Sequence, residues 1–166
     1  QRLDHPPATA QEHAEACRSL LRFGGFPEPF LRAEEAFHNV WHQERKTMLV
    51  RQDIRDATRI REVSLLEVLT HLVPSRVGSP LSVNSLREDV GVAYETVRDW
   101  LLVLAQFYYL FHVTPWSKSL ARALKKEAKV YLYDWVEVAS AGPRFENLVA
   151  LHLHKAVQVW GALGAP

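Results

Sequence analysis

Apolar residues recur every three or four positions along most of the chain, which is the periodicity of amphipathic helices. Thr9 and Glu12 have the spacing of a capping box, and the pattern behind them predicts a first helix that stops at Gly24. A long helix is predicted over residues 34–58, with an apolar side opposite a charged side. Between these helices, the aromatic and proline-rich run 26–30 predicts a rigid loop.

Three shorter helices are predicted next, separated by brief turns. Ser64 and Glu67 repeat the capping-box spacing, which predicts a short helix that continues to about His71. Ser82 and Ser85 are both suitable caps for the following helix, and Gly91 suits the turn that ends it.

The third of these helices is predicted from about Ala93 to Leu110, with a buried stripe made of Val97, Leu101, Leu104 and Tyr108. Residues 112–116 and 129–133 then change to extended, β-favouring runs. They enclose a basic segment, residues 118–126. A final helix is predicted to start at Pro143 and to continue to about Val159.

Three helices followed by two strands around a basic tip are in the order of a winged helix-turn-helix. The predicted fold class is therefore mostly α with a small β wing, an α+β arrangement. We expect a helical lid-like segment over residues 1–60, a winged helix-turn-helix domain over residues 61–135, and a C-terminal helix within residues 136–166.

Composition narrows the function classes. Of the 166 residues, 48% are hydrophobic and 23% charged, which is the balance of a globular protein. Lys and Arg number 20 against 19 Asp and Glu, so the net charge is +1 and any nucleic-acid contact must come from a local basic patch. The single cysteine, Cys17, lies on an apolar stripe and is predicted to be a buried, inert thiol. We expect a cytoplasmic protein without a membrane segment.

No complete active site is recognisable. The chain lacks a G-x-x-x-x-G-K-[ST] phosphate loop, and its serines and its cysteine lack a nucleophile motif. His38 and His42 are four residues apart and could share a metal ion, but no third ligand is evident nearby and ordinary histidines are the favoured interpretation. We therefore predict a chain that is not an enzyme, with no cofactor and no metal of its own.

Two groups of residues are predicted to contact DNA. Thr96 and Arg98 lie near the start of the second helix of the helix-turn-helix, where base edges are read, although Glu95 and Asp99 beside them would repel phosphate. The alternative is a solvated helix face with local ion pairs. The wing offers a more basic set: Lys118, Arg122, Lys125, Lys126 and Lys129. Its alternative is a hairpin that the charges keep soluble.

Several short runs follow one another in a recognisable order. Gly24-Gly25-Phe26-Pro27-Glu28 follows the first predicted helix, and Phe145-Glu146-Asn147-Leu148-Val149 lies in the last one. Between them, a K-x-x-K-x-Y-x-x-D pattern ends at Asp134. This order resembles the region behind the ATPase core in a large group of uncharacterised prokaryotic AAA-type ATPases. Trp135, where a small residue is usual, and Ala93, where Ser or Thr is usual, depart from the pattern.

The resemblance implies a parent protein with an N-terminal P-loop ATPase, which would bind ATP and Mg²⁺, and with a nuclease-like domain at the other end. The chain begins with Gln1 and matches the middle of that plan, so we expect it to be a fragment. Glu146 resembles an acidic residue of the nuclease-like fold, but its partners are missing, and a structural role is the favoured interpretation.

The predicted function is that of a non-catalytic winged-helix module of an AAA-type ATPase, with duplex DNA as its partner through the basic wing. The alternative is a protein-interaction or oligomerisation module that docks on the ATPase core or on a second copy. That alternative would use exposed aromatic side chains, for which the sequence suggests Trp41, Tyr109, Trp116 and Trp160.

Overall fold

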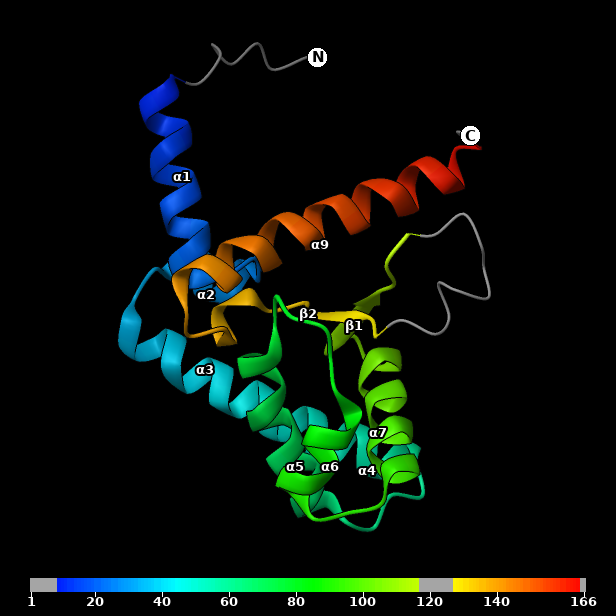
Figure 1. Cartoon of the computed structure of the whole chain (residues 1–166). Coiled ribbons are helices and arrows are strands. Elements are labelled where there is room, and N and C mark those ends of the chain that lie inside the picture. The colour runs from blue at the N-terminus through cyan, green and yellow to red at the C-terminus, as the bar shows by residue number, and fades with distance from the viewer. Residues whose placement is uncertain (1–8, 117–126, 165–166) are drawn as a thin grey trace.

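The computed structural model describes residues 9–116 and 127–164, and the described part is mostly helical with one small antiparallel sheet (Figure 1). The predicted class, mostly α with a small β element, is confirmed at this level. The first third of the chain contains α1 (Ala10–Phe23), α2 (Pro27–Arg32), α3 (Glu35–Met48), the π-helical segment η1 (Leu49–Ile54) and α4 (Arg55–Ala57). The rest contains α5 (Val63–Leu72), η2 (Val73–Arg76), α6 (Val83–Val90), α7 (Tyr94–Gln106), β1 (Leu110–Val113), β2 (Lys129–Leu132), η3 (Trp135–Glu137) and α9 (Ala141–Ala162).

The capping box at the start of α1 is confirmed. The Glu12 amide donates to Thr9 Oγ1 at 3.3 Å, and the Thr9 amide donates to a Glu12 carboxylate oxygen at 2.6 Å.

The loop predicted over residues 26–30 is wrong, because α2 starts at Pro27. Prolines are tolerated in the first turn of a helix, where the amide that they lack would have no intrahelical partner. Cys17 is half-buried rather than buried.

The long helix predicted over residues 34–58 is confirmed as the run of α3, η1 and α4, with a π-helical segment in its middle. Val50 and Ile54 of η1 are completely buried and belong to the main core. The second half of the long run therefore contributes to the main hydrophobic core.

The cap predicted for α5 is wrong. Glu62 occupies the N-cap position without a side-chain hydrogen bond, and Ser64 lies exposed inside the helix. For α6, Ser82 is the cap that is used, since its hydroxyl accepts from the Ser85 amide at 3.4 Å. Gly91 ends α6 in the left-handed conformation at φ 78°, as predicted.

The helix predicted to reach Leu110 stops at Gln106. Tyr108 adopts φ 56°, its amide donates to Ala105 O, and the Tyr109 amide donates to Leu104 O, which together form a Schellman-type end. The left-handed turn exchanges the two tyrosines relative to prediction: Tyr108 is 67% exposed and Tyr109 only 3%. Tyr109 is therefore no exposed contact residue.

The two strands pair antiparallel, with Leu110 opposite Leu132 and Val113 opposite Lys129. The segment before α6 joins the other edge of β2, because Pro80 bridges to Lys129 and the Leu81 amide donates to Ala128 O at 2.9 Å. Helix α7 packs against α6 and runs directly into this sheet.

Helix α9 lies across the sheet end of the molecule and continues outward beyond it (Figure 1). Its inward side buries Asn147, Leu148 and Leu151 against β2 and η3. Side chains from η1, α5, α6, α7, both strands and α9 form one hydrophobic cluster, so η1 shares a core with the strands.

Candidate functional site

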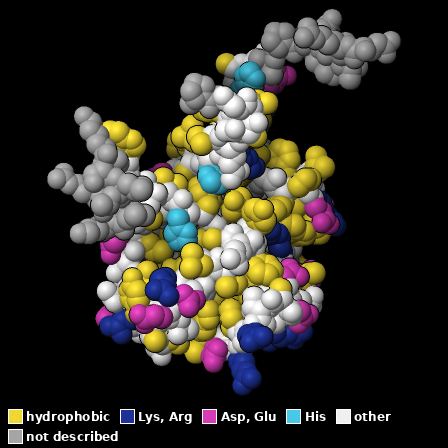
Figure 2. Space-filling model, turned by 90° about the vertical axis from the view of Figure 1, so that its right-hand side faces the viewer, with side chains coloured by type: hydrophobic (Ala, Val, Ile, Leu, Met, Phe, Trp, Pro, Cys, Tyr) yellow, Lys and Arg dark blue, Asp and Glu magenta, His cyan; other side chains and the backbone are white. Residues whose placement is uncertain are grey.

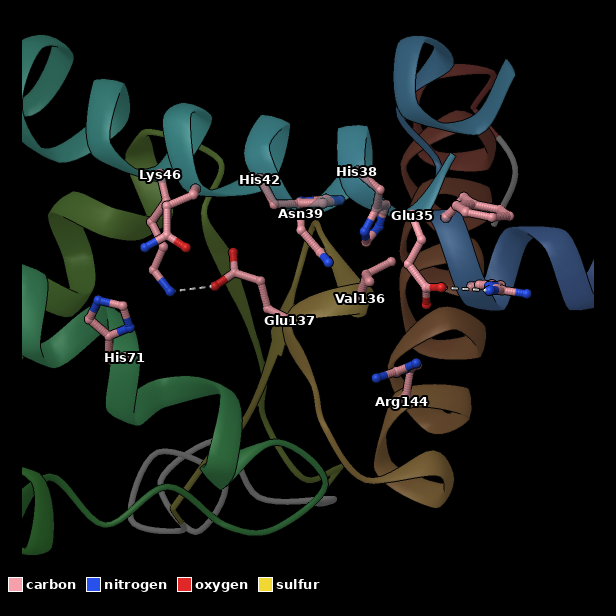
Figure 3. A pocket seen from close by; sticks show the side chains of 12 residues that line it. Glu35, His38, Asn39, His42, Lys46, His71, Val136, Glu137 and Arg144 are labelled. Atoms are coloured by element: carbon pink, nitrogen blue, oxygen red, sulfur yellow. Dashed lines mark hydrogen bonds and ion pairs between the residues drawn. The ribbon is translucent and has the colours of Figure 1, made fainter. Parts of the chain in front are cut away.

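A cleft of about 460 Å³ opens where the end of α1, helix α3, segment η3 and the start of α9 meet (Figure 3). The sequence does not predict this cleft, because its walls come from parts of the chain that are more than 100 residues apart. Its lining is rich in polar and basic side chains: Arg22, Phe23, Glu35, His38, Asn39, His42, Gln43, Lys46, His71, Val136, Glu137 and Arg144.

Two histidines form the buried wall of the cleft. His38 and His42 lie one turn apart on α3, and their ring centroids are 4.2 Å apart. His42 Nδ1 donates to Asp134 Oδ2 at 2.6 Å, which orients that ring. The Nε2 atoms of both rings are buried without a hydrogen-bond partner among the described residues. Burial, and secondarily the neighbouring His42, lowers the pKa of His38, so the neutral ring is favoured.

Asp134 is held beside His42 by a tight contact between distant segments. A Cβ atom on Gly25 would lie 2.6 Å from the Trp135 ring, so only glycine fits there. Trp135 Nε1 donates to Leu20 O at 2.9 Å, which fastens η3 to the end of α1. The Gly24-Gly25 run and the Asp134 motif, 110 residues apart by number, therefore meet at one place.

The opposite side of the cleft holds a buried ion pair. Lys46 Nζ lies 2.8 Å from Glu137 Oε2, and both side chains are largely buried. The Tyr109 hydroxyl lies 2.9 Å from the same carboxylate oxygen and 2.8 Å from Thr70 O. Burial, with the Glu137 charge second, raises the pKa of Tyr109, so its hydroxyl stays protonated.

The predicted alternative of a metal shared by His38 and His42 gains no third ligand. Among residues 9–116 and 127–164, no group of three or more His, Cys, Asp or Glu side chains is placed to hold a metal ion. Zinc sites normally take three or four protein ligands. The Asp134–His42 contact is thus explained as an internal hydrogen bond.

Two of the residues predicted to contact DNA, Arg98 and Lys129, form ion pairs within the chain. Arg98 lies on the exposed side of α7 and donates to Asp99 Oδ1 at 3.0 and 3.1 Å. Lys129 lies on β2, and its Nζ is 3.0 Å from Glu146 Oε1. Thr96 is half-buried on α7. The remaining predicted residues lie outside the described part of the chain: Lys118, Arg122, Lys125 and Lys126.

The charges on the face shown in Figure 2 are mixed. Lys and Arg side chains lie next to Asp and Glu side chains there and do not gather into one basic field. The structure therefore gives the described part of this face little attraction for a polyanion.

Glu146 and Asn147 hold α9 on the sheet. Glu146 Oε1 accepts from the Tyr131 hydroxyl at 2.7 Å and from Lys129 Nζ at 3.0 Å, and these two hydrogen bonds lower the pKa of Glu146. Asn147 pairs with the backbone of Leu132. The Gly24-Gly25 run and the Glu146-Asn147 pair, from the first and last motifs of the resemblance, thus both have structural roles.

The outward side of α9 is apolar. Phe145, Val149, Leu153, Val157 and Trp160 recur at intervals of four and three, so they form one stripe, and they are 39–62% exposed. Leu148 and Leu151 are buried on the inward side instead. A stripe of this kind marks a surface that another chain or segment can cover.

The sequence matches, over residues 14–136, a family described as a domain of unknown function, DUF8612. Because the match spans more than half of the chain, the protein belongs to that family. The match identifies neither an ATPase core nor a nuclease-like domain. No curated protein and no solved structure matches the sequence. None of the helices in the described part of the chain has the length and apolar content needed to cross a bilayer.

Proposed function

We propose that residues 63–132 form a winged helix-turn-helix unit in the non-catalytic part of an AAA-type ATPase, and that this unit contacts duplex DNA through its wing. The observation that carries the proposal is the arrangement of α5, α6 and α7 followed by an antiparallel hairpin, with the Pro80–Leu81 segment joined to β2. The strands flank the segment 118–126, which supplies four of the five predicted wing cations.

The proposal assigns DNA contact to the wing and not to α7. Arg98 would have to leave Asp99, and Glu95 would remain close to phosphate. Lys129 is likewise paired with Glu146 at the base of the hairpin. An exposed ion pair is weak enough to break, but each such exchange lowers the net gain from a phosphate contact. ATP and Mg²⁺ belong to the ATPase core of the parent protein in this proposal, and the compartment is the cytoplasm.

Fluorescence anisotropy of a labelled short duplex, measured over a salt series, tests the proposal. We expect binding at low salt that weakens steeply as salt rises, because released counterions drive it. Lys125→Glu combined with Lys126→Glu should weaken binding about tenfold or more. Arg61→Glu combined with Lys155→Glu makes the same change in net charge at exposed positions elsewhere and should have a much smaller effect. No binding at low salt, or equal losses in both double variants, would reject DNA contact through the wing.

A second candidate function, self-association, is favoured by the outward stripe of α9. The stripe carries no charged side chain, since Glu146 is bonded to β2 and Lys155 lies on another face of the helix. Two copies could therefore pack α9 against α9 around a two-fold axis without like-charge repulsion. Six exposed apolar side chains, with Leu163 included, offer on the order of 600 Å² per copy, close to what a modest specific interface buries.

Sedimentation velocity over a range of protein concentrations tests self-association. We expect a dimer that Leu153→Glu with Val157→Glu converts to a monomer, because two carboxylates in an apolar contact lose their hydration. Leu31→Glu on α2 introduces a charge at a position that is 79% exposed outside the stripe and should leave the dimer intact. A wild-type chain that stays monomeric throughout would reject this candidate, as would an ATPase core that binds the stripe in place of the second copy.

A further inference from the structure

The carboxylates in and behind the cleft between α3 and the start of α9 all have partners within the chain. Both carboxylates in its lining are already paired, Glu35 with Arg22 at 3.0 Å and Glu137 with Lys46 at 2.8 Å. Asp134, behind the lining, is bonded to His42. The acidic groups of this region are therefore satisfied by the chain itself.

Of the three Lys and Arg side chains in the lining, Arg144 is the one that has no carboxylate partner among the described residues. Its Nε donates to Val138 O at 2.7 Å and one Nη donates to Ala139 O at 3.4 Å, so its contacts are with neutral carbonyls. No carboxylate among the described residues lies within ion-pair distance of it. A guanidinium has five N–H donors, and the two carbonyl contacts hold the group in place while they leave others unused. Figure 3 shows Arg144 reaching from α9 towards the space below α3.

The formal charge of the lining is positive. Three basic side chains stand against two acidic ones, which leaves a net charge of +1, and the side chains of Asn39 and Gln43 add exposed amide donors. Phe23 and Val136 supply an apolar wall. A pocket that is partly apolar and has a few convergent polar groups is the usual form of a small-molecule site, and a preorganised guanidinium selects oxyanions.

We propose that this cleft binds a small molecule through an oxyanion group, a carboxylate or a phosphate, that Arg144 and the amides on α3 receive. The site is separate from the wing and from the α9 stripe, so it does not depend on the function proposed above. Its volume of about 460 Å³ suits a metabolite and is too small for a folded partner.

Titration of the ¹⁵N-labelled chain with sodium phosphate and, separately, with sodium succinate tests the proposal, with sodium chloride at matched ionic strength as the reference. We expect saturating shifts of the Asn39 and Gln43 side-chain amides and of the Val136 amide with at least one of the two anions. Saturation by phosphate alone assigns a phosphate ligand, and saturation by succinate alone assigns a carboxylate. Shifts that stay linear with both anions, or that chloride reproduces, overturn the proposal.

Variants separate the cleft from general charge effects. Arg144→Gln should weaken binding about tenfold or more, because a charged hydrogen bond is lost. Arg98→Gln removes the same charge from α7 and should leave binding within twofold. Because Arg144 also holds two carbonyls, Asn39→Asp serves as a second variant that changes only an exposed side chain, with Asn84→Asp on α6 as its control. Asn39→Asp should likewise weaken binding several-fold, and equal effects of Asn39→Asp and Asn84→Asp would overturn the proposal.

Discussion

Asn147 and Leu132 form a two-bond pair between a side chain and a strand. The Leu132 amide donates to Asn147 Oδ1 at 2.8 Å, and Asn147 Nδ2 donates to Leu132 O at 2.7 Å. Asn147 is completely buried, and it satisfies backbone groups at the end of β2 that would otherwise have no partner there. The pair fixes where α9 crosses the sheet.

Asn147→Ala should therefore lower the free energy of unfolding by about 2–4 kcal/mol, since two buried backbone groups lose their partners. Urea unfolding followed by circular dichroism measures the change. Asn84→Ala, which removes an amide bonded to the exposed Arg87, should stay within about 0.5 kcal/mol of wild type. Similar values for the two variants would show that the pair contributes little to stability.

A substitution at Gly25 tests the contact between the end of α1 and η3. Gly25→Ala places a methyl group 2.6 Å from a Trp135 ring carbon, and the large ring is itself buried and hydrogen-bonded to Leu20. We expect a loss of about 1–3 kcal/mol from overpacking, with a matching drop in the urea midpoint.

Gly161→Ala is the matched control for that change. No atom lies within 4 Å of an added Cβ there, and the residue is inside α9. Alanine should be neutral or more stable by up to about 1 kcal/mol, because it is the better helix former. A neutral Gly25→Ala would contradict the packing described for Trp135.

Alanine substitutions at Ser82 and Ser64 test which of the two serines caps a helix. Ser82→Ala removes the N-cap acceptor of α6 and should cost about 0.5–1 kcal/mol. Ser64→Ala changes an exposed residue inside α5 and should be neutral or slightly stabilising, because alanine has the higher helix propensity. Thermal or urea unfolding of both variants compares them directly, and the reverse order would mean that α5 starts at Ser64.

The lowered pKa of His38 leads us to expect that the protein loses stability in mild acid. Burial, and then His42, lowers its pKa from the ordinary value of 6.5, while Asp134 and Glu35 partly oppose this. A histidine with a depressed folded-state pKa takes up its proton more readily when the chain is unfolded. Its stabilising contribution is therefore present above pH 6.5, is lost as the pH falls below 6.5, and is gone below the folded-state pKa.

Urea unfolding at several values between pH 7 and pH 5 measures that dependence. We expect His38→Gln to flatten it in part, with the remainder supplied by other groups such as His112, whose pKa burial also lowers. His13→Gln, at an exposed position on α1, should leave the slope unchanged. An unchanged slope in His38→Gln would exclude His38 as the source.

Much of the secondary structure was predictable because it depends on neighbours in the sequence. Helix periodicity, the Thr9–Glu12 box and the left-handed Gly91 all act within one or two turns, and all three are present. The errors were also local in form. The capping-box spacing favours Ser64 over Glu62 as the cap of α5. The sequence also predicts too late an end for α7, because the Schellman turn at Tyr108 uses a non-glycine residue.

Local features of the sequence predict the order and type of the long helices and of both strands, but not α2, because propensity, capping and apolar spacing are short-range effects. Tertiary packing sets which polar groups meet: His42 with Asp134, Asn147 with Leu132, and Arg144 with the Val138 carbonyl. These pairs join residues from 6 to 92 positions apart, where chain-wide packing, and not local spacing, sets the distance. Local rules therefore gave the helices and strands of this protein, and its cleft emerged only when they packed together.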